Sequence, residues 1–413
     1  MSTSLPDSPV PILIVGAGAA GLWAGATAAH LGAETVILEK TRRTGTKVLS
    51  SGGTRCNLTT TLDTDAAARC FGHGHNFIRP ALKSLSPQQV RQRFEELGVR
   101  TKEESQFEKV FPKSDSAREV RDALERAARR SGVNIVLESP VTAIDRVGDC
   151  WTAHTPHRSW KAQRLLLCTG GKSYPKTGTT GDGYPWLRAL GLKVADPVPA
   201  LVPLVSSAPW VHALSGISVD VEISIGKAKR RRPVLFTHRG LSGPGAMDLS
   251  EQVTQHGHRE VQLDLLPDHS WEEVRQLLID GAQRPGSPRL GSLFDLPRRV
   301  MDTLVQQTGL ATSNPPLNQI TKAQRHGLVQ ILKAWKIPVS GSVGFAKAEV
   351  TAGGLELHQV DRHTMEVKTH PGLYVFGELL NLQGPIGGFN FQAAFATAEL
   401  AARAAAASLR TET

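Results

Sequence analysis

The stretch Val10-Pro-Ile-Leu-Ile-Val15, followed at once by Gly16-Ala-Gly18-Ala-Ala-Gly21, decides the fold. The first six residues are typical of a strand buried on both faces, and an apolar helical pattern then runs up to Gly32. We interpret Gly16 as the tight turn, Gly18 as the point where backbone can approach a pyrophosphate, and Gly21 as the helix–strand contact. Ala20 lies in the same turn and belongs to the expected ligand contacts. The stretch therefore predicts a dinucleotide-binding βαβ unit of Rossmann type.

An acidic residue supports a bound nucleotide rather than a bare glycine-rich turn. Glu39 ends a second apolar strand, Thr35 to Leu38, 23 positions after Gly16. A carboxylate there can accept both ribose hydroxyls, whereas it would repel a 2′-phosphate. FAD and NAD both fit this arrangement, and NADP fits poorly. Lys40, the next residue, is also an expected cofactor contact.

Two later segments separate FAD from NAD through a resemblance. Leu165-Leu-Leu-Cys-Thr-Gly-Gly171 resembles the strand and Thr-Gly segment found midway along flavoproteins of the glutathione-reductase-like class. Leu373-Tyr-Val-Phe-Gly-Glu378 resembles their closing strand, although the acidic residue there is usually Asp. Gly387-Gly-Phe-Asn390 would then place a helix N-terminus beneath the flavin ring, where its dipole stabilises negative charge on reduced flavin. The resemblance implies cofactor contacts from the following residues: Thr169, Gly170, Gly377, Glu378, Gly388, Phe389 and Asn390.

Longer motifs resemble one family, the BaiN/YhiN-type bacterial flavoproteins. They are Lys47-Val-Leu-Ser-Ser-Gly-Gly-Thr-Arg-Cys-Asn57, Leu235-Phe-Thr-His-Arg-Gly-Leu-Ser-Gly-Pro244, Ala348-Glu-Val-Thr-Ala-Gly-Gly354 and Thr364-Met-Glu366. The chain departs from the family pattern at Asn381, where Asp is usual, and in the Leu-Gln-Gly-Pro linker after it. The implied cofactor contacts include Lys47, Cys56 and Asn57.

Two more expected cofactor contacts come from other segments. Val141 starts a predicted strand. Asp182 lies in Thr180-Gly-Asp-Gly183, which resembles a stretch of fumarate-reductase-type flavoproteins. A plain helix N-cap is the alternative role for Asp182.

The resemblance implies an α/β fold with a discontinuous domain organisation. A glutathione-reductase-like, Rossmann-type FAD-binding domain would comprise residues 1–198 and 346–413. The inserted residues 199–345 would form a substrate or cap domain, β-rich over 199–255 and 336–345 and helical over 256–335. The sequence pattern agrees, because prolines cluster at 197–203, residues 219–225 alternate as a strand should, and a mostly helical pattern follows from residue 271.

The composition allows partners other than a small molecule. The formal charge is +10 and the isoelectric point is near 9.6, which suits nucleic acid or anionic substrates. The densest basic run, Lys227-Ala-Lys-Arg-Arg-Arg232, lies between strand-like segments, and we interpret it as a solvated hairpin tip. Few aromatic residues surround it, which argues against nucleic-acid base stacking and favours a small-molecule substrate.

Cysteine spacing and the N-terminal pattern narrow the class further. No two of the four cysteines lie within 13 residues, which excludes a CxxC redox pair and a local zinc site, so no metal is expected.

A second GxGxxG motif is also absent. NADH or NADPH, as the electron donor, would therefore bind transiently at the flavin face. The glycine spacing at residues 16–32 explains the apolar N-terminal stretch better than a membrane segment does, so we expect a cytoplasmic protein.

The favoured function is an FAD-dependent oxidoreductase that passes hydride from a nicotinamide donor through flavin N5 to an organic acceptor such as an activated C=C bond. His238 and Arg239 are the candidate proton donor and anion-stabilising group, and Arg55 is a second candidate for the latter. Cys56 is expected to pack rather than to act as a nucleophile. Two alternatives stay open: a flavin-dependent RNA-modifying enzyme, and a non-catalytic flavin-binding regulatory protein. The sequence predicts neither the substrate nor the oligomeric state.

Overall fold

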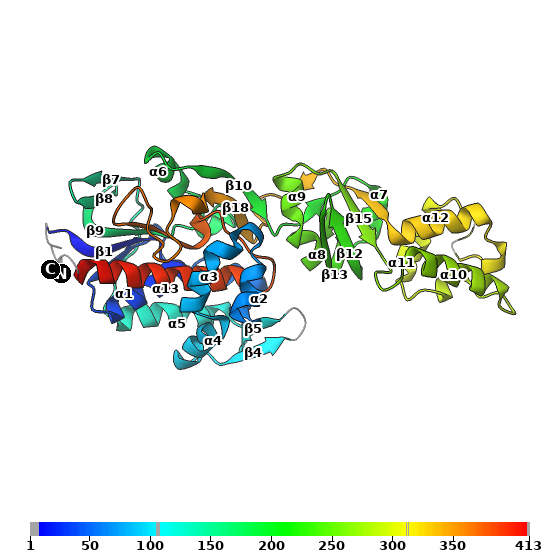
Figure 1. Ribbon diagram of the computed structural model, residues 1–413, viewed down its shortest axis with the longest axis horizontal. Helices are drawn as coiled ribbons and strands as arrows, with labels where there is room; N and C mark the ends of the chain where they lie inside the picture. The colour runs from blue at the N-terminus through cyan, green and yellow to red at the C-terminus, as the bar shows by residue number, and fades with distance from the viewer. Residues whose placement is uncertain (1–7, 105–107, 311, 313, 411–413) are drawn as a thin grey trace. The chain divides into compact units, whose positions relative to one another are not determined.

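The computed structural model describes residues 8–104, 108–310, 312 and 314–410 (Figure 1). The described chain forms two compact units. The first comprises residues up to Val198 together with those from Glu349 onward, and the second comprises Pro199–Ala348.

A parallel sheet forms the centre of the first unit. Its strands follow the order β6–β2–β1–β9, and β19 pairs with the carboxyl-terminal half of β9. Antiparallel β8 and β7 continue the sheet from the amino-terminal half of β9. The bounds are β1 (Val10–Val15), β2 (Thr35–Leu38), β6 (Asn134–Val136), β7 (Ala143–Val147), β8 (Cys150–His154), β9 (Ser159–Leu167) and β19 (Leu373–Val375). β1 and β2 are buried along almost their whole length, as their continuous apolar runs predict.

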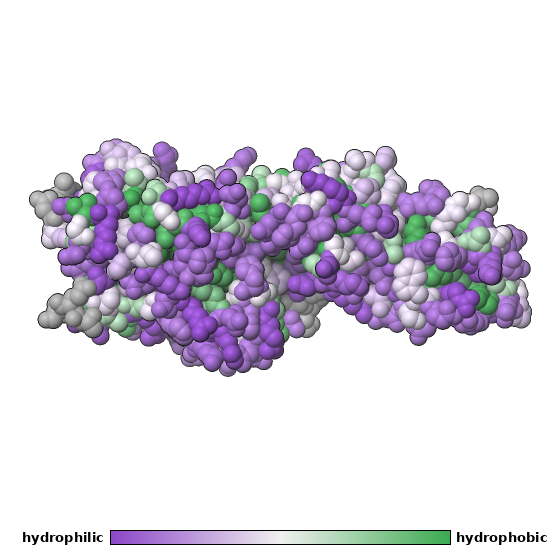
Figure 2. Space-filling model, turned by 45° about the horizontal axis from the view of Figure 1, so that its top comes forward, coloured by the Kyte–Doolittle hydropathy of each residue, from purple (hydrophilic) through white to green (hydrophobic). Residues whose placement is uncertain are grey.

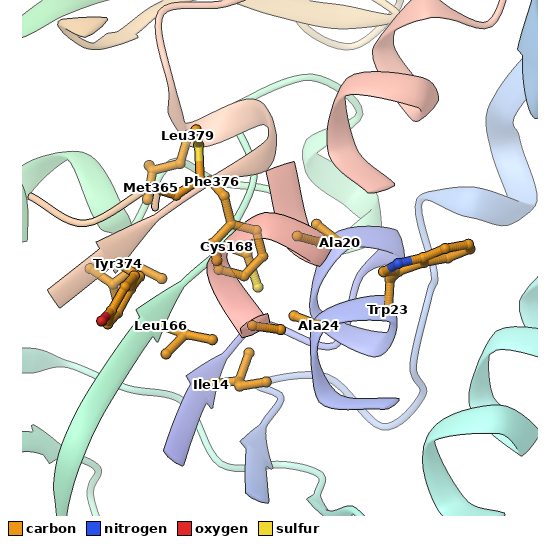
Figure 3. Packing of buried hydrophobic residues seen from close by; sticks show 14 of the residues in the cluster. Ile14, Ala20, Trp23, Ala24, Leu166, Cys168, Met365, Tyr374, Phe376 and Leu379 are labelled. Atoms are coloured by element: carbon orange, nitrogen blue, oxygen red, sulfur yellow. The ribbon is translucent and has the colours of Figure 1, made fainter. Parts of the chain in front are cut away.

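Helices α1 (Ala19–His30) and α13 (Phe389–Arg410) pack side by side in this unit, although they come from opposite ends of the chain (Figure 1). Figure 3 shows the apolar core that joins α1 to the sheet: Ala20 and Ala24 face Ile14 of β1, Leu166 of β9 and Cys168 after it, whereas Trp23 points away from them on the other side of α1. Small residues on α1 allow this close packing, since a Cβ at Gly25 would lie 2.7 Å from Ile37. The predicted Rossmann-type α/β fold is confirmed.

The other elements of the first unit surround this sheet. Helix α4 begins at Pro87, because Ser86 and Gln89 form a reciprocal capping box at its N-terminus. The remaining helices and strands are α2 (Thr64–Arg69), α3 (His75–Ser84), α4 (Pro87–Glu96), α5 (Ala117–Arg130), α6 (Gly183–Ala189), a three-stranded sheet of β3 (Thr59–Thr60), β5 (Lys109–Pro112) and β4 (Thr101–Glu104), and a two-stranded sheet of β10 (Val194–Ala200) and β18 (Val350–Leu355).

The second unit contains a sheet in the order β16–β15–β12–β13–β14–β11–β17, with every described pairing antiparallel. Its strands are β11 (Leu204–Val205), β12 (Ser218–Ile225), β13 (Ala228–Thr237), β14 (Gly240–Ser242), β15 (Glu260–Asp264), β16 (Trp335–Pro338) and β17 (Gly341–Ser342). Its helices are α7 (Pro209–Ala213), α8 (Gly243–Asp248), α9 (Ser250–Thr254), α10 (Trp271–Gln283), α11 (Arg298–Gln307) and α12 (Lys322–Lys333). Trp335 lies at the centre of its core, stacked on Trp210 with ring centroids 5.0 Å apart.

Two details of the second unit differ from the sequence-based expectation. The segment 256–335, expected to be helical, includes strand β15, whose alternating Val261 and Leu263 face the core and pair with the sheet. The basic run does lie in a hairpin, but the turn is at Gly226 and Lys227, and the other basic residues lie along β13. Three of them form ion pairs: Lys229 with Glu222, Arg231 with Asp268, and Arg232 with the buried Asp248.

The surface seen in Figure 2 is mostly hydrophilic, with hydrophobic residues in scattered patches. Within the described ranges, α13 is the longest helix, and neither it nor any other combines the length and apolar character that a membrane crossing requires.

One buried carboxylate joins α1 to α13. Glu399 is 1% exposed and accepts hydrogen bonds from Trp23 Nε1 at 2.8 Å and Thr27 Oγ1 at 2.7 Å, and it pairs with Arg403. Burial raises the pKa of Glu399, but the hydrogen bonds from Thr27, Trp23 and Arg403 outweigh it and hold the pKa below its usual value.

We expect Glu399→Gln to lower the free energy of unfolding by about 1–3 kcal/mol at neutral pH, because a charged acceptor of buried donors is lost. Because the folded-state pKa is lowered, this stabilisation is present above the unfolded-state pKa near 4.3 and is lost as pH falls through the folded-state value. Denaturant unfolding of both proteins at neutral and acidic pH measures the difference, which should shrink in acid. The control, Glu96→Gln, removes an exposed pair and should cost less than about 0.5 kcal/mol. Equal losses in the two variants would contradict the role given to Glu399.

Candidate cofactor site

Parallel strand pairing brings the predicted cofactor segments to one edge of the sheet. Val15 at the end of β1 pairs with Leu38 of β2 and Leu167 of β9, and Leu167 also pairs with Val375 of β19. The residues that follow these strands therefore leave the sheet on the same side. They are Gly16, Glu39, Thr169 and Glu378, and ligands bind at such carboxyl ends in open α/β sheets.

The three glycines of the first turn have different surroundings. A Cβ at Gly16 would lie 2.8 Å from the Cys168 carbonyl oxygen, and one at Gly21 would lie 1.8 Å from the Gly16 carbonyl oxygen. No atom lies within 4 Å of the Cβ position at Gly18, the residue that precedes α1. Gly16 and Gly21 are thus required by packing, whereas Gly18 leaves its backbone open to a ligand. The close packing at Gly16 and Gly21 agrees with the sequence interpretation, and the pyrophosphate contact at Gly18 stays a prediction.

Glu39 is fixed against the same turn. Its carboxylate accepts hydrogen bonds from the Ala17 backbone N–H at 2.8 Å and from the backbone and hydroxyl of Thr41 at 2.9 and 2.8 Å. Lys40 points to a different group, because its ammonium donates to Asp182 and to Thr180 Oγ1. Asp182 precedes α6 but makes no side-chain cap, so its observed partners are Lys40 and Thr180.

The segment after β9 carries a buried hydroxyl without a partner. Thr169 Oγ1 is inaccessible and makes no hydrogen bond within the described part of the chain. Tyr184 OH on α6 is in the same condition, and burial, followed by the nearby Glu378 charge, raises the pKa of Tyr184. Gly183, the first residue of α6, allows the helix to approach Thr169 closely, since a Cβ there would lie 2.6 Å from Thr169 Oγ1. A buried donor is seldom left unsatisfied, so the Thr169 hydroxyl is suited to a ligand or an ordered water.

Glu378 receives three donors. One oxygen accepts from Lys47 Nζ at 2.5 Å, and the other accepts from Ser173 Oγ at 3.0 Å and the Thr351 backbone N–H at 2.9 Å. Gly377, with φ of 68°, brings this segment to the first turn, because its Cβ position is 3.2 Å from Ala20 Cβ. The beginning and the end of the sequence therefore meet beside the predicted phosphate turn.

The start of α13 is anchored by Asn57. With its side-chain amide oriented to satisfy its neighbours, Asn57 accepts from the Gly388 backbone N–H at 2.9 Å and donates to Val110 and Thr59 carbonyl oxygens. Gly388 is required there because a Cβ would lie 2.3 Å from the Thr59 carbonyl oxygen. Asn390 folds back onto Gly384 through two hydrogen bonds of 2.9 Å.

Phe389, also expected to be a cofactor contact, is a core residue. It is 1% exposed and packs edge-on against Phe71. The observed partners of Phe389, like those of Asn57 and Asn390, belong to the protein. These three residues set the position of the α13 N-terminus.

The segment from Gly52 to Cys56 is tightly bent, with positive φ at Gly52, Gly53, Thr54 and Cys56. The Cys56 side chain is fully buried, and burial raises the pKa of its thiol to about 12. A thiol that stays protonated is a poor nucleophile, which agrees with the packing role expected for Cys56.

Arg55 is occupied by acidic neighbours. Its guanidinium pairs with Glu104 and with Asp115 at 2.7 Å, and it lies 4.1 Å from the centre of the Phe111 ring. The hydrogen bonds that Arg55 donates to Glu104 and Asp115 raise the pKa of Arg55. Two carboxylates compensate its charge, which makes Arg55 less suited to stabilising charge on a substrate.

The other predicted catalytic residues belong to the second unit. His238 and Arg239 are exposed in the turn between β13 and β14, where the Arg239 backbone bonds to Thr237 and Ser206.

All expected cofactor contacts belong to the first unit. Val141 is among them: it follows Glu138 and Ser139, whose backbone N–H groups bond to Thr41 and Glu39 carbonyl oxygens.

Sequence reasoning did not select three residues that the structure places at this edge, Ser173, Thr351 and Tyr184. Thr351 lies inside the motif Ala348–Gly354, and its hydroxyl amid small apolar residues was the available signal. Ser173 directly follows Gly171 and Lys172. No known sequence motif with a fixed spacing predicts the hydrogen-bond partners of Ser173 or Thr351.

A separate polar cavity of about 380 Å³ opens in the first unit between β3 and the N-terminus of α4. It is lined by Thr60, Thr61, Leu62, Asp63, Thr64, Ser86, Pro87, Gln88, Arg91, Glu103 and Val110. None of these is an expected cofactor contact. Within the described ranges, no group of three or more histidine, cysteine, aspartate or glutamate side chains could hold a metal ion.

The cofactor edge fits a dinucleotide such as FAD. Gly18 offers open backbone at a helix N-terminus for a pyrophosphate, and Glu39 offers a carboxylate at the ribose position. The Thr169 hydroxyl and the Lys47–Glu378 pair supply further polar groups near the end of β19.

The chain matches one family model and several known proteins over most of its length. The family model described as HI0933-like protein Rossmann domain matches residues 10–404. A ribosomal RNA dihydrouridine synthase from Haemophilus influenzae is 31% identical, covering 94% of this chain and 96% of that protein. A 3-dehydro-bile acid delta(4,6)-reductase from Clostridium scindens is 30% identical, covering 95% of this chain and 98% of that protein.

A solved structure shares the fold. The 3-ketosteroid-delta4-(5alpha)-dehydrogenase from Rhodococcus jostii superposes with a TM-score of 0.54 at 15% identity, covering 98% of each chain. The predicted resemblance to BaiN/YhiN-type flavoproteins and the predicted enzyme class are confirmed. Because the family model spans nearly all of the sequence and relatives of at least 30% identity cover both chains almost completely, this protein belongs to the HI0933-like family of Rossmann-fold, FAD-dependent oxidoreductases.

Proposed function

We propose that the protein binds FAD at the carboxyl edge of the parallel sheet and reduces a C=C bond conjugated to a carbonyl group. The observation that carries this proposal is the convergence of Gly18, Glu39 and Glu378 on one edge, in a chain whose relatives bear the names of two C=C reductions. Forming a dihydrouridine and reducing a delta(4,6) bile acid each add two hydrogens across a C=C bond. Bound FAD would supply hydride transfer at N5.

The protein's own residues have two tasks in such a reaction. Hydride addition to the β-carbon leaves negative charge on the carbonyl oxygen, so a cation or hydrogen-bond donor must stabilise that oxygen and a proton must reach the α-carbon. His238 and Arg239 are exposed, and among the described residues the hydrogen bonds of Arg239 involve only its backbone. We therefore favour these two residues for the proton-donating and anion-stabilising roles over Arg55, which two carboxylates bind.

Glu39→Arg should weaken FAD binding roughly 100-fold, because it removes a carboxylate that can accept charge-assisted hydrogen bonds and puts a cation in its place. Titration of FAD into the apo-protein measures the dissociation constant. Glu34→Arg makes the same charge change at the exposed other end of β2 and should leave FAD binding near wild type. Retention of FAD by Glu39→Arg at wild-type strength would contradict the ribose assignment.

NADH or NADPH added anaerobically should bleach the long-wavelength absorbance of bound FAD, and an enone such as a 4-ene-3-ketosteroid should restore it. Stopped-flow absorbance follows both half-reactions. His238→Gln should slow reoxidation by about 100-fold and leave bleaching unchanged, because a positioned proton donor contributes about that factor. If neither nicotinamide bleaches the flavin, the proposed donor is wrong, and the non-catalytic regulatory alternative is favoured.

A second candidate substrate is uridine within RNA, favoured by the name of the Haemophilus influenzae relative and by the net charge of +10. The C5=C6 bond of uracil is conjugated to a carbonyl, so the chemistry at the flavin would be the same. Ion pairs compensate three of the five cations in the densest basic run, Lys229, Arg231 and Arg232, so this run offers less positive charge to RNA than its sequence suggests.

For an RNA substrate, we expect binding to ribosomal RNA fragments to weaken steeply with salt, because each phosphate contact releases counterions. Incubation with NADPH should then make a uridine two hydrogens heavier, as mass spectrometry would detect. Binding that stays flat between low and moderate salt, with unchanged nucleosides, would exclude RNA and leave the small-molecule acceptor.

A further inference from the structure

Two fully buried hydroxyl side chains, Ser173 and Thr351, lie between the segments that carry the expected FAD contacts. Both side chains are 0% exposed. Among the described residues, neither Ser173 nor Thr351 forms a hydrogen bond with the glycine turn Gly16–Gly21. Their partners belong to the Lys47 loop, the turn after Thr169 and the Glu378 segment.

Thr351 holds the turn that follows β9. Its hydroxyl oxygen accepts from the Lys172 backbone N–H at 2.7 Å and from the Ser173 backbone N–H at 3.2 Å. Gly171 lies directly on this hydroxyl, since a Cβ there would be 2.3 Å from Thr351 Oγ1. The Thr351 backbone N–H donates in turn to Glu378 at 2.9 Å. One residue of β18 therefore fixes both the 171–173 turn and the carboxylate after β19.

Ser173 connects the same carboxylate to Lys47. Its hydroxyl accepts from Lys47 Nζ at 2.6 Å and can donate to Glu378 Oε1 at 3.0 Å. Lys47 itself donates to the other Glu378 oxygen. An ammonium has three N–H donors, and these two bonds use two of them, which leaves one for a ligand.

Glu378 lies at the centre of this network. Its carboxylate accepts hydrogen bonds from Lys47, Ser173 and Thr351 together. The carboxylate thereby orients the Lys47 ammonium, whose third N–H is left for a ligand.

We propose that Thr351 and Ser173 are positioning residues of the FAD site. They hold the 169–173 turn, Lys47 and Glu378 in one arrangement, and this arrangement is what gives Lys47 and Thr169 a fixed geometry toward the cofactor. The proposal rests on the FAD binding proposed above. It does not depend on which acceptor is reduced.

The test is the affinity of the apo-protein for FAD, measured by quenching of flavin fluorescence without donor or acceptor. Thr351→Val keeps the shape of the side chain but leaves two backbone N–H groups without an acceptor, and it should weaken FAD binding about tenfold or more. Thr351→Ser restores the hydroxyl and should return the affinity to within about threefold of wild type. Ser250→Ala removes another fully buried hydroxyl that accepts a backbone N–H, from Val202 in the second unit, and should leave FAD affinity unchanged.

Several results would overturn the proposal. Wild-type affinity in Thr351→Val would do so, as would an equal loss in Ser250→Ala, because the effect would then be one of general stability. If Thr351→Val does not fold, Ser173→Ala should weaken FAD binding about fivefold. That loss should disappear in a Lys47→Met background, since Ser173 acts through Lys47, and additive losses would contradict this route. Normal FAD binding without reduction of any acceptor would contradict only the proposed function.

Discussion

Parallel pairing of β1 with β2 and β9, and of β9 with β19, is the constraint on which the site depends. It aligns the ends of four strands, of which the first and the last lie more than 300 residues apart in the sequence, so that the residues after them share one edge of the sheet. Side chains alone would not bring Gly16 and Gly377 together. The backbone ladder does, and the burial of β1 and β2 on both faces makes a slip of register costly, because it would change which residues face the core on each side.

The closing helix stabilises this arrangement. Helix α13 packs on α1, and the buried Glu399 bonds to Trp23 and Thr27 of that helix. The C-terminal part of the chain thus secures the helix whose N-terminus follows the open Gly18. A dipole at a helix end is useful to a ligand only if the helix is rigidly placed, and this contact provides the placement.

Electrostatic pairing separates the residues around the site into two kinds. Gly18, Thr169 and one N–H of Lys47 have capacity for a ligand, whereas Arg55, Asn57 and Asp182 are engaged by protein partners. Protein partners also engage charged residues in the second unit, where carboxylates pair with three cations of the basic run at Lys227–Arg232. Net charge therefore overstates the cationic surface that either unit offers to a polyanion.

Local patterns by themselves determined the βαβ unit, the need for glycine at Gly16 and Gly21 in the first turn, and the resemblance to one flavoprotein family. Each of these depends on backbone conformation or periodicity within a few residues, which a sequence records directly. Strand β15 was missed because its alternation is short and lies between two helices, α9 and α10. Only the tertiary structure decided that Arg55 binds two carboxylates, that Asn57 anchors Gly388, and that Ser173 and Thr351 join Lys47 to Glu378. Such pairings link side chains tens to hundreds of positions apart. They are fixed by packing and by the need to satisfy buried polar groups, for which no spacing in the sequence gives a rule.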